Sequence, residues 1–233
     1  MSTLQAVELG VLGPLQVRRD GAPVMIPGAK PRAILTMLGL HGGSVVSAET
    51  LIELLWGDDP PRTAAKALQT HISSLRRTLG DGFVLTAGTG WTLAESGVDA
   101  SRYKSAARLG RDAAAAGDTS QAVSRFEEAL ALWRGIPELP DGRRGTSEKT
   151  RWIEGHAALV DDRADALLVT GRAAEIIGEL EAAVAEAPLR ERRWGQLMLA
   201  LYRAGRQGDA LGAYQRARAL LADELGEIGR AHV

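Results

Sequence analysis

A repeat with a period of 34 residues runs through the second half of the chain. Two segments, "GRAAEIIGELEAAV" (171–184) and "GRQGDALGAYQRAR" (205–218), align without gaps and share a Gly-Arg pair, a second glycine and an alanine. An earlier segment, "GDTSQAVSRFEEAL" (117–130), has Ala and Phe at matching places. A fixed period of this length is typical of stacked helix pairs, which bury their apolar faces only against their neighbours. The repeat therefore predicts an all-α domain over residues 98–226.

The period is that of the tetratricopeptide repeat, in which large and small side chains alternate between paired helices. In the last unit the residues that fill these places are Trp194, Leu197, Leu201, Ala210, Tyr214 and Ala217. The alternative is an Ala-rich helical bundle in which the spacing arises by chance. Between the first two units, "IPELPDGRRGTSEK" (136–149) is rich in Pro, Gly and charge, which predicts a loop.

The first 97 residues have a different sequence pattern, with short alternating apolar runs separated by Gly and Pro. The run "VELGVLGPLQVRRDGAPVMI" (7–26) predicts strands joined by turns. One helix is expected with Pro31 in its first turn, and another after Ser47, which is a candidate N-cap. The segment "FVLTAGTGWTLA" (83–94) predicts a β-hairpin around a Gly-Thr-Gly turn. We therefore expect one α+β domain over residues 1–97.

The segment "PPRTAAKALQTHISSLRRTLG" (60–80) has four cations and no carboxylate between Arg62 and Leu79, although the chain has a net charge of −1. At about 100° per residue, one side of this helix is an apolar stripe. The stripe consists of Leu68, Ile72, Leu75 and Leu79. The opposite side consists of Lys66, Thr70, Ser73 and Arg77, flanked by Arg62, Thr63, Gln69, Ser74 and Arg76. This segment is either a solvated helix that happens to be basic or a helix that enters the major groove of DNA.

The order of the elements favours DNA. Helix, short strand, helix, turn, basic helix and hairpin follow one another as in a winged helix-turn-helix. In that arrangement the basic helix lies in the major groove, and free N–H groups at its start, near Thr63, favour a phosphate. The hairpin that carries Thr89 lies beside the minor groove, where Gly88 and Gly90 allow a close approach. The sequence thus predicts a mainly α protein: a winged helix-turn-helix followed by an all-α, tetratricopeptide-like domain.

Three stretches carry a resemblance to a known family: "LWGDDPP" (55–61), "LRRTLG" (75–80) and "YRAGRQGDAL" (202–211). Over about residues 7 to 226 the chain resembles the SARP group (Streptomyces antibiotic regulatory proteins), which are transcriptional activators of actinobacteria. The resemblance implies an OmpR-type winged helix DNA-binding domain at 1–97 and a bacterial transcriptional activator domain at 98–226. The chain departs from the large relatives in one respect: the sequence contains no G-x-x-x-x-G-K-[ST] motif, so we expect their ATPase module to be missing.

The function implied by the resemblance is sequence-specific activation of transcription. Such a protein binds direct repeats of double-stranded promoter DNA near −35 elements. It recruits RNA polymerase holoenzyme through the sigma factor and other subunits, and controls a secondary-metabolite or similar gene cluster. The implied location is the cytoplasm, at the nucleoid, with no membrane partner. Self-association on DNA, an inducing ligand and polymerase contact remain alternative roles for the helices after residue 97.

The resemblance also implies particular DNA contacts. Recognition-helix contacts fall on Lys66, Thr70, Ser74 and Arg77, and wing contacts fall on Thr89 and Gly90. By position, Arg62 and Thr63 are candidates for phosphate contact. Trp56 and Trp91 match family positions, but we expect them to pack inside the winged domain.

Composition argues against several other functions. Without cysteine, the chain can form no disulfide, thiol nucleophile or Cys-based zinc site. His41, His71, His156 and His232 have no metal-ligand spacing, so we expect neither an enzyme nor a cofactor. The apolar run "AILTMLGL" (33–40) is too short to span a membrane. The remaining alternative is a tetratricopeptide adaptor whose N-terminal domain binds protein rather than DNA.

The last seven residues, "EIGRAHV" (227–233), correspond to the translation of a common short-read sequencing adapter. We therefore expect the natural reading frame to have been interrupted at about Gly226 and the tail to be non-native and disordered.

Overall fold

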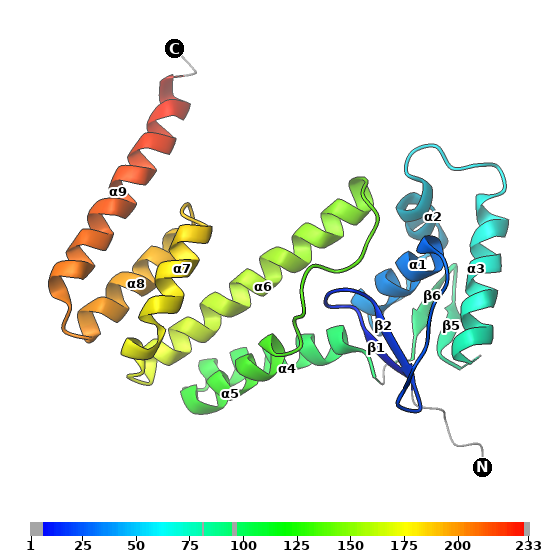
Figure 1. Cartoon of the computed structure of the whole chain (residues 1–233), viewed down its shortest axis with the longest axis horizontal. Coiled ribbons are helices and arrows are strands. Elements are labelled where there is room, and N and C mark those ends of the chain that lie inside the picture. Colours follow the sequence, from blue (N-terminus) through cyan, green and yellow to red (C-terminus); the bar gives the residue numbers. More distant parts are fainter. Residues whose placement is uncertain (1–6, 81, 95–96, 231–233) are drawn as a thin grey trace. The chain divides into compact units, whose positions relative to one another are not determined.

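Figure 1 shows the computed structural model of the chain, which describes residues 7–80, 82–94 and 97–230. The chain divides into two compact units. The first comprises Met1–Arg108 and Glu128–Ala157, and the second comprises Leu109–Glu127 and Ala158–Val233. The first unit contains the described strands and the second is helical, which confirms the predicted fold class.

The first unit contains two small antiparallel sheets and three helices before residue 97. The first sheet has the order β1 (Val7–Gly10), β2 (Gln16–Arg19) and β3 (Ala22–Pro23). The second sheet has the order β4 (Val46–Ser47), β6 (Gly90–Leu93) and β5 (Val84–Ala87). The helices are α1 (Ala29–Leu40), α2 (Ala48–Trp56) and α3 (Ala64–Leu79). The hairpin predicted at 83–94 is confirmed, and so is the helix with Pro31 in its first turn, which begins at Ala29.

Local sequence signals explain where these helices begin and which sides they bury. The predicted N-cap of α2 is confirmed, because the Thr50 N–H donates to Ser47 Oγ at 3.1 Å. The apolar stripe of α3 is also confirmed, since its four side chains are at most 2% exposed. Burying a leucine or isoleucine side chain contributes about 1.5–3 kcal/mol. Trp91 is buried as expected, and the half-buried Trp56 ring has Lys30 Nζ 4.3 Å from its centroid.

A carboxylate beyond residue 97 accepts hydrogen bonds from the segment that directly follows β1. Asp99, at the start of α4 (Asp99–Ala115), accepts hydrogen bonds from the N–H groups of Val11 at 2.8 Å and Leu12 at 3.1 Å. Arg134 donates to Asp99 at 3.3 Å and to the Pro14 carbonyl at 2.9 Å. Val11 and Leu12 are fully buried, so water cannot replace these acceptors. Packing of the first unit therefore continues past residue 97, and the domain boundaries at 97 and 226 stay predictions.

The sequence predicted a loop over residues 136–149. This prediction is wrong over its second half, because α6 (Arg143–Val169) begins at Arg143. Arg143 donates to Glu53 of α2 at 2.7 Å, and Arg144 Nε donates to the same carboxylate at 2.9 Å. The charges that suggested a solvated loop therefore hold the first turn of a helix against α2, and they keep the pKa of Glu53 below its ordinary value.

The same turn recurs at three places among the other helical elements. These elements are α5 (Thr119–Leu130), the 3₁₀ segment η1 (Ala173–Ile176), α7 (Ile177–Glu186), α8 (Glu191–Arg203) and α9 (Gln207–Arg230). Gly117, Gly171 and Gly205 precede α5, η1 and α9 with φ of 82°, 79° and 76°. In each turn the next residue donates its N–H to the carbonyl five residues back: Asp118 to Ala113, Arg172 to Leu167 and Arg206 to Leu201.

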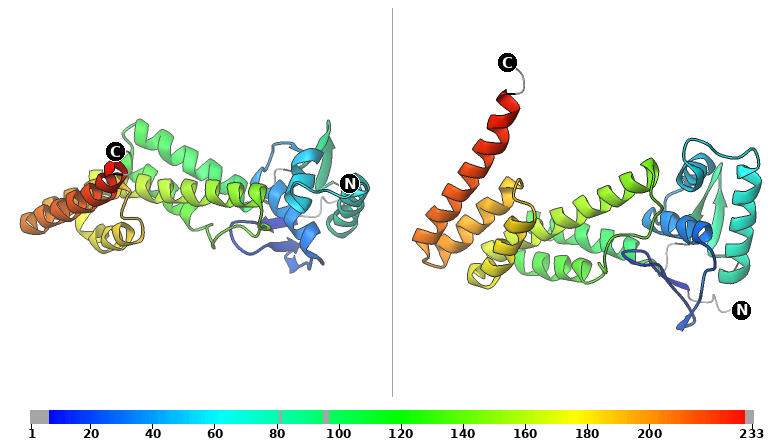
Figure 2. Two further views of the ribbon diagram at one scale, coloured as in Figure 1. Left: turned by 90° about the horizontal axis from the view of Figure 1, so that it is seen from above. Right: turned by 45° about the horizontal axis from the view of Figure 1, so that its top comes forward.

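This hydrogen bond with a left-handed glycine is a Schellman motif, and glycine adopts that conformation without steric cost. The sequence repeat therefore corresponds to a repeated turn between helices. Within the last unit, α8 and α9 lie side by side in both views of Figure 2.

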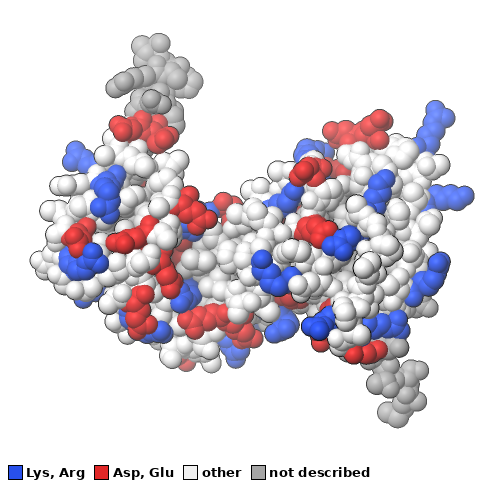
Figure 3. All heavy atoms as spheres, in the orientation of Figure 1, with Lys and Arg blue, Asp and Glu red and all other residues white. Residues whose placement is uncertain are grey.

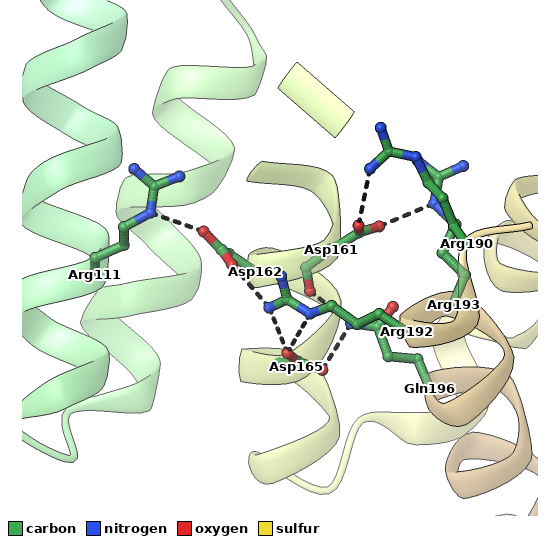
Figure 4. Close-up of polar contacts among 8 residues, drawn as sticks. All are labelled: Arg111, Asp161, Asp162, Asp165, Arg190, Arg192, Arg193 and Gln196. Carbon is green, nitrogen blue, oxygen red and sulfur yellow. Dashed lines mark hydrogen bonds and ion pairs between the residues drawn. The ribbon is translucent and has the colours of Figure 1, made fainter. Parts of the chain in front are cut away.

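A charged cluster joins the helices of the second unit (Figure 4). Asp161 of α6 and Arg193 of α8 form an ion pair of 3.0 Å and are only 5% and 6% exposed. Next to them, Asp162 accepts from Arg111 of α4 and Arg192 of α8, both at 2.8 Å. Removing one partner of a buried pair costs about 3–5 kcal/mol, so the Asp161–Arg193 pair fixes how α6 and α8 pack.

The last helix continues to Arg230, so residues 227–230 are helical where disorder was expected. Residues 231–233 of the predicted tail, with His232, lie outside the described residues. Within the described part of the chain, every helix is too short or too polar to cross a membrane.

Replacing Asp99 tests the link across residue 97. We expect Asp99→Ala to lower the free energy of unfolding, because two buried N–H groups lose their acceptor at about 1–3 kcal/mol each. Asp99→Asn keeps one acceptor oxygen and is the matched control, with a smaller loss. Urea unfolding measures both. Equal stability of Asp99→Ala and the unmodified chain would show that β1 does not depend on α4.

Candidate nucleic-acid interface

The two sides of α3 have opposite character. Its buried side packs against α1 and α2, while the opposite side is open to solvent. The predicted contact residues that are exposed on or just before α3 are Arg62, Thr63, Lys66, Thr70, Ser73 and Arg77. In Figure 3, Lys and Arg side chains project from the edge of the molecule at which Figure 1 shows α3. The side of the helix expected to face DNA is therefore not covered by its own unit.

Three cations of this surface are not committed to internal bonds. Among the described residues, Arg62, Lys66 and Arg77 have no carboxylate within ion-pair distance and no hydrogen-bond acceptor. By contrast, Arg32 of α1 makes a bidentate pair with Glu138 at 2.8 and 2.6 Å. Phosphate contacts from the three free cations would therefore break no bond within the described chain.

The start of α3 offers a further place for a phosphate. Thr63 is its N-cap residue, and its hydroxyl makes no capping hydrogen bond. The first N–H groups of a helix point outward and carry a partial positive charge, so they favour an anion. The exposed guanidinium of Arg62 stands next to this helix end.

Two of the predicted contact residues are less exposed to solvent. Ser74 is half-buried, and its carbonyl accepts from the Thr78 hydroxyl at 3.1 Å. Gly90 is buried and paired with Ser47 and Ala87 in the second sheet. A Cβ atom at Gly90 would lie 2.1 Å from the Val46 carbonyl oxygen. Close packing of β6 against β4 is therefore sufficient to explain why position 90 is glycine, without any DNA contact.

The hairpin turn keeps an exposed residue at its tip. Thr89 is exposed, and its carbonyl accepts from the Ala48 N–H at 3.2 Å. Gly88 before it has φ of 54°, a conformation that glycine adopts readily. The tip is therefore anchored to the start of α2 through its backbone, while the Thr89 side chain is available.

The fourth cation of the basic segment behaves differently. Arg76 Nε donates to the Val84 carbonyl at 2.8 Å, and its Nη2 donates to Thr86 Oγ1 at 2.7 Å. Both acceptors lie on β5, the first strand of the wing hairpin. Sequence reasoning placed Arg76 on the flank of the basic face and gave no signal of this partner.

His71 of α3 does not add to the positive charge of the surface. It is half-buried, and burial lowers its pKa, with a further lowering from the nearby Lys30. The imidazole is therefore neutral near pH 7.

Among the residues that the structure describes, no three His, Asp or Glu side chains come together to hold a metal ion. The described site is thus a polar, cationic surface.

Two family models match the chain. Residues 98–230 match the bacterial transcriptional activator domain, and residues 25–89 match the model described as "Transcriptional regulatory protein, C terminal". The regulatory protein AfsR of Streptomyces coelicolor is 39% identical over 226 residues, which cover 95% of this chain and 23% of AfsR. The regulatory protein DnrI of Streptomyces peucetius is 34% identical, covering 94% of this chain and 86% of DnrI.

The transcriptional regulatory protein EmbR of Mycobacterium tuberculosis is 39% identical over 236 residues, which cover 94% of this chain and 59% of EmbR. The solved structure of M. tuberculosis EmbR in complex with a low affinity phosphopeptide has a TM-score of 0.87 and 36% sequence identity. It covers 95% of this chain and 61% of that one. The chain thus spans less than two thirds of both AfsR and EmbR.

A winged helix of the OmpR type together with a bacterial transcriptional activator domain defines a class of transcriptional regulators. AfsR, EmbR and DnrI are SARP-family regulators. The chain belongs to the SARP family of transcriptional regulators, which confirms the resemblance inferred from the sequence.

The lowered pKa of His71 predicts that the free energy of unfolding depends on pH. Below its ordinary value of about 6.5 the unfolded chain takes up a proton that the folded chain resists, so acidification towards pH 5 lowers the free energy of unfolding. In His71→Gln this part of the pH dependence should be absent, as measured by urea unfolding at pH 7.5 and 5. If the variant and the unmodified chain lose the same stability, His71 is not held neutral.

Proposed function

We propose that the chain is a sequence-specific DNA-binding activator that binds direct repeats near promoter −35 elements and recruits RNA polymerase holoenzyme, including its sigma factor. The observation that supports this most directly is the outward side of α3, where Lys66 and Arg77 are exposed and have no partner among the described residues. We further propose that it acts in the cytoplasm, at the nucleoid, on a secondary-metabolite or similar gene cluster, as the family implies.

The dimensions of α3 suit a major groove. A helix with its side chains is about 10–12 Å wide, and the groove of B-DNA is about 12 Å wide. Lys66 and Arg77 lie about 16 Å apart along the axis at 1.5 Å per residue, which is roughly the rise of five base pairs. The planar fork of Arg77 suits a phosphate that flanks the bases, and the short Thr70 and Ser73 side chains let the helix approach the base edges. Arg62, Thr63 and Ser74 then serve as flanking contacts.

The wing supplies a second contact. Thr89 at the hairpin tip is placed beside the backbone or minor groove when α3 occupies the major groove. Gly90 supports this contact by keeping β6 close to β4.

An acidic loop supports the proposed contact with polymerase. Asp58 and Asp59 lie between α2 and α3 and are exposed, and the Asp58 side chain is 92% exposed with Arg143 Nη2 3.9 Å from its Oδ1. Carboxylates are repelled by phosphates, so this loop is suited to face away from DNA, towards a basic protein surface. A polymerase bound to the adjacent promoter sequence is within reach of such a loop. Self-association on tandem sites remains part of the proposal.

Replacing Lys66 and Arg77 with alanine tests DNA binding. On promoter fragments from the genes beside its own gene, we expect affinity to fall by about 10- to 100-fold. The slope of log K against log salt should become shallower by about 0.9 for each lost phosphate contact. The exposed Arg218 of α9 is a matched control, and Arg218→Ala should leave both quantities unchanged. Salt-independent binding, or equal affinity of the double variant, would favour the protein-binding adaptor instead.

The acidic loop is tested by Asp58→Asn with Asp59→Asn. Because the loop is proposed to contact polymerase, we expect unchanged promoter affinity but at least a several-fold loss of transcript in reconstituted transcription. Glu49→Gln, at an exposed carboxylate in the first turn of α2, controls for loss of negative charge alone. Full activation by the double variant would remove the loop from the proposal.

A further inference from the structure

Arg76 has the chemistry of a DNA contact but a different set of neighbours from the other cations of the basic segment. It lies on α3 directly before Arg77. Arg77 is exposed, whereas Arg76 is half-buried. Two N–H donors of its guanidinium are already bonded to strand β5.

The two bonds have a definite geometric effect. One acceptor is the backbone carbonyl of Val84, a fully buried residue, and the other is the hydroxyl of Thr86. These residues are two apart in β5, so a planar guanidinium that bonds both fixes the strand in position and in orientation. A separate hydrogen bond reaches α3 from the first sheet: Arg19 of β2 donates to the Thr78 carbonyl at 3.1 Å. The C-terminal turns of α3 are therefore bonded to both sheets.

We propose that Arg76 is a positioning residue, which holds the wing at the distance and angle from α3 that lets both touch one DNA duplex. This inference rests on the proposed DNA binding. Without Arg76 the hairpin keeps its strands, since β5 and β6 pair with each other from Val84–Leu93 to Ala87–Gly90. What is lost is the direct bond between β5 and the reading helix, so the angle of the wing is less well defined and fixing it then opposes binding.

The consequence for DNA binding differs from that of a phosphate contact. A lost phosphate contact makes the salt dependence shallower by about 0.9. A lost positioning residue weakens binding with little change in that slope. Loss of the positioning residue also reduces the contribution of the wing contacts to the binding free energy. The effects of substituting Arg76 and Thr89 are therefore expected to be coupled, although Thr89 lies beyond the end of β5.

The experiment compares identical changes at neighbouring arginines. Arg76→Met and Arg77→Met are measured on the same promoter fragment over a range of salt, each alone and combined with Thr89→Ala. We expect Arg76→Met to lower affinity by about tenfold with an unchanged salt slope, and to abolish most of the effect of Thr89→Ala. We expect Arg77→Met to flatten the slope by about 0.9 and to act independently of Thr89.

Two milder variants keep the test valid if Arg76→Met weakens the fold. Thr86→Val has nearly the same shape but removes one acceptor, so it should reproduce part of the loss and show coupling to Arg76→Met. Arg76→Lys keeps the charge but cannot make the forked pair of bonds, so it should resemble Arg76→Met. Arg77→Lys should stay close to the unmodified chain in salt slope. Thermal unfolding of each variant reports on the fold separately.

The outcomes separate the two proposals. If the unmodified chain shows no salt-dependent binding, the proposed function fails. If it binds but Arg76→Met flattens the slope as Arg77→Met does, and Arg76→Lys restores it, then Arg76 is a phosphate contact and the inference is wrong. Unchanged affinity of Arg76→Met, or no coupling to Thr86 and Thr89, overturns it equally.

Discussion

The burial of one apolar stripe on α3 is the constraint on which the site depends. Leu68, Ile72 and Leu75 are at most 1% exposed, and each contributes about 1.5–3 kcal/mol by leaving water. A helix is rigid, so fixing its inner side also fixes what faces outward. The same packing that forms the core therefore presents Lys66 and Arg77 to solvent, and folding and the proposed DNA recognition share one physical cause.

The arginines of the chain fall into two groups: some form internal ion pairs, and others are exposed on the cationic surface of α3. In the helical unit they hold elements together, as in the buried pair of Arg193 with Asp161, where an unpaired charge would be costly. In the first unit Arg32 is paired with Glu138, which keeps the pKa of that carboxyl low. Arg62 and Arg77 have no such partner within the described residues. A nearly neutral protein thus carries a local cationic surface, which overall composition does not reveal.

Family models and packing divide the chain at different places. The activator-domain model begins at residue 98, yet Asp99 supplies acceptors for the buried N–H groups of Val11 and Leu12. Lys104 donates to the Leu40 carbonyl at 2.7 Å, and His41 bonds Glu148 at 3.2 Å. These bonds mean that the fold around the DNA-binding helices includes residues from the following domain. Changes there are expected to alter the stability of the winged helix.

The sequence by itself determined the features that depend on neighbours along the chain. The 3.6-residue period placed the stripe of α3, Ser47 marked the start of α2, and the 34-residue period aligned Gly171 with Gly205. Only the tertiary structure decided that Arg76 is bonded to the wing, that Gly90 is buried, and that Arg143 begins a helix against Glu53. The physical reason is that periodicity and capping act over one or two turns. The partners of Arg76 and Arg143 are set by how separate elements pack, which no local pattern encodes.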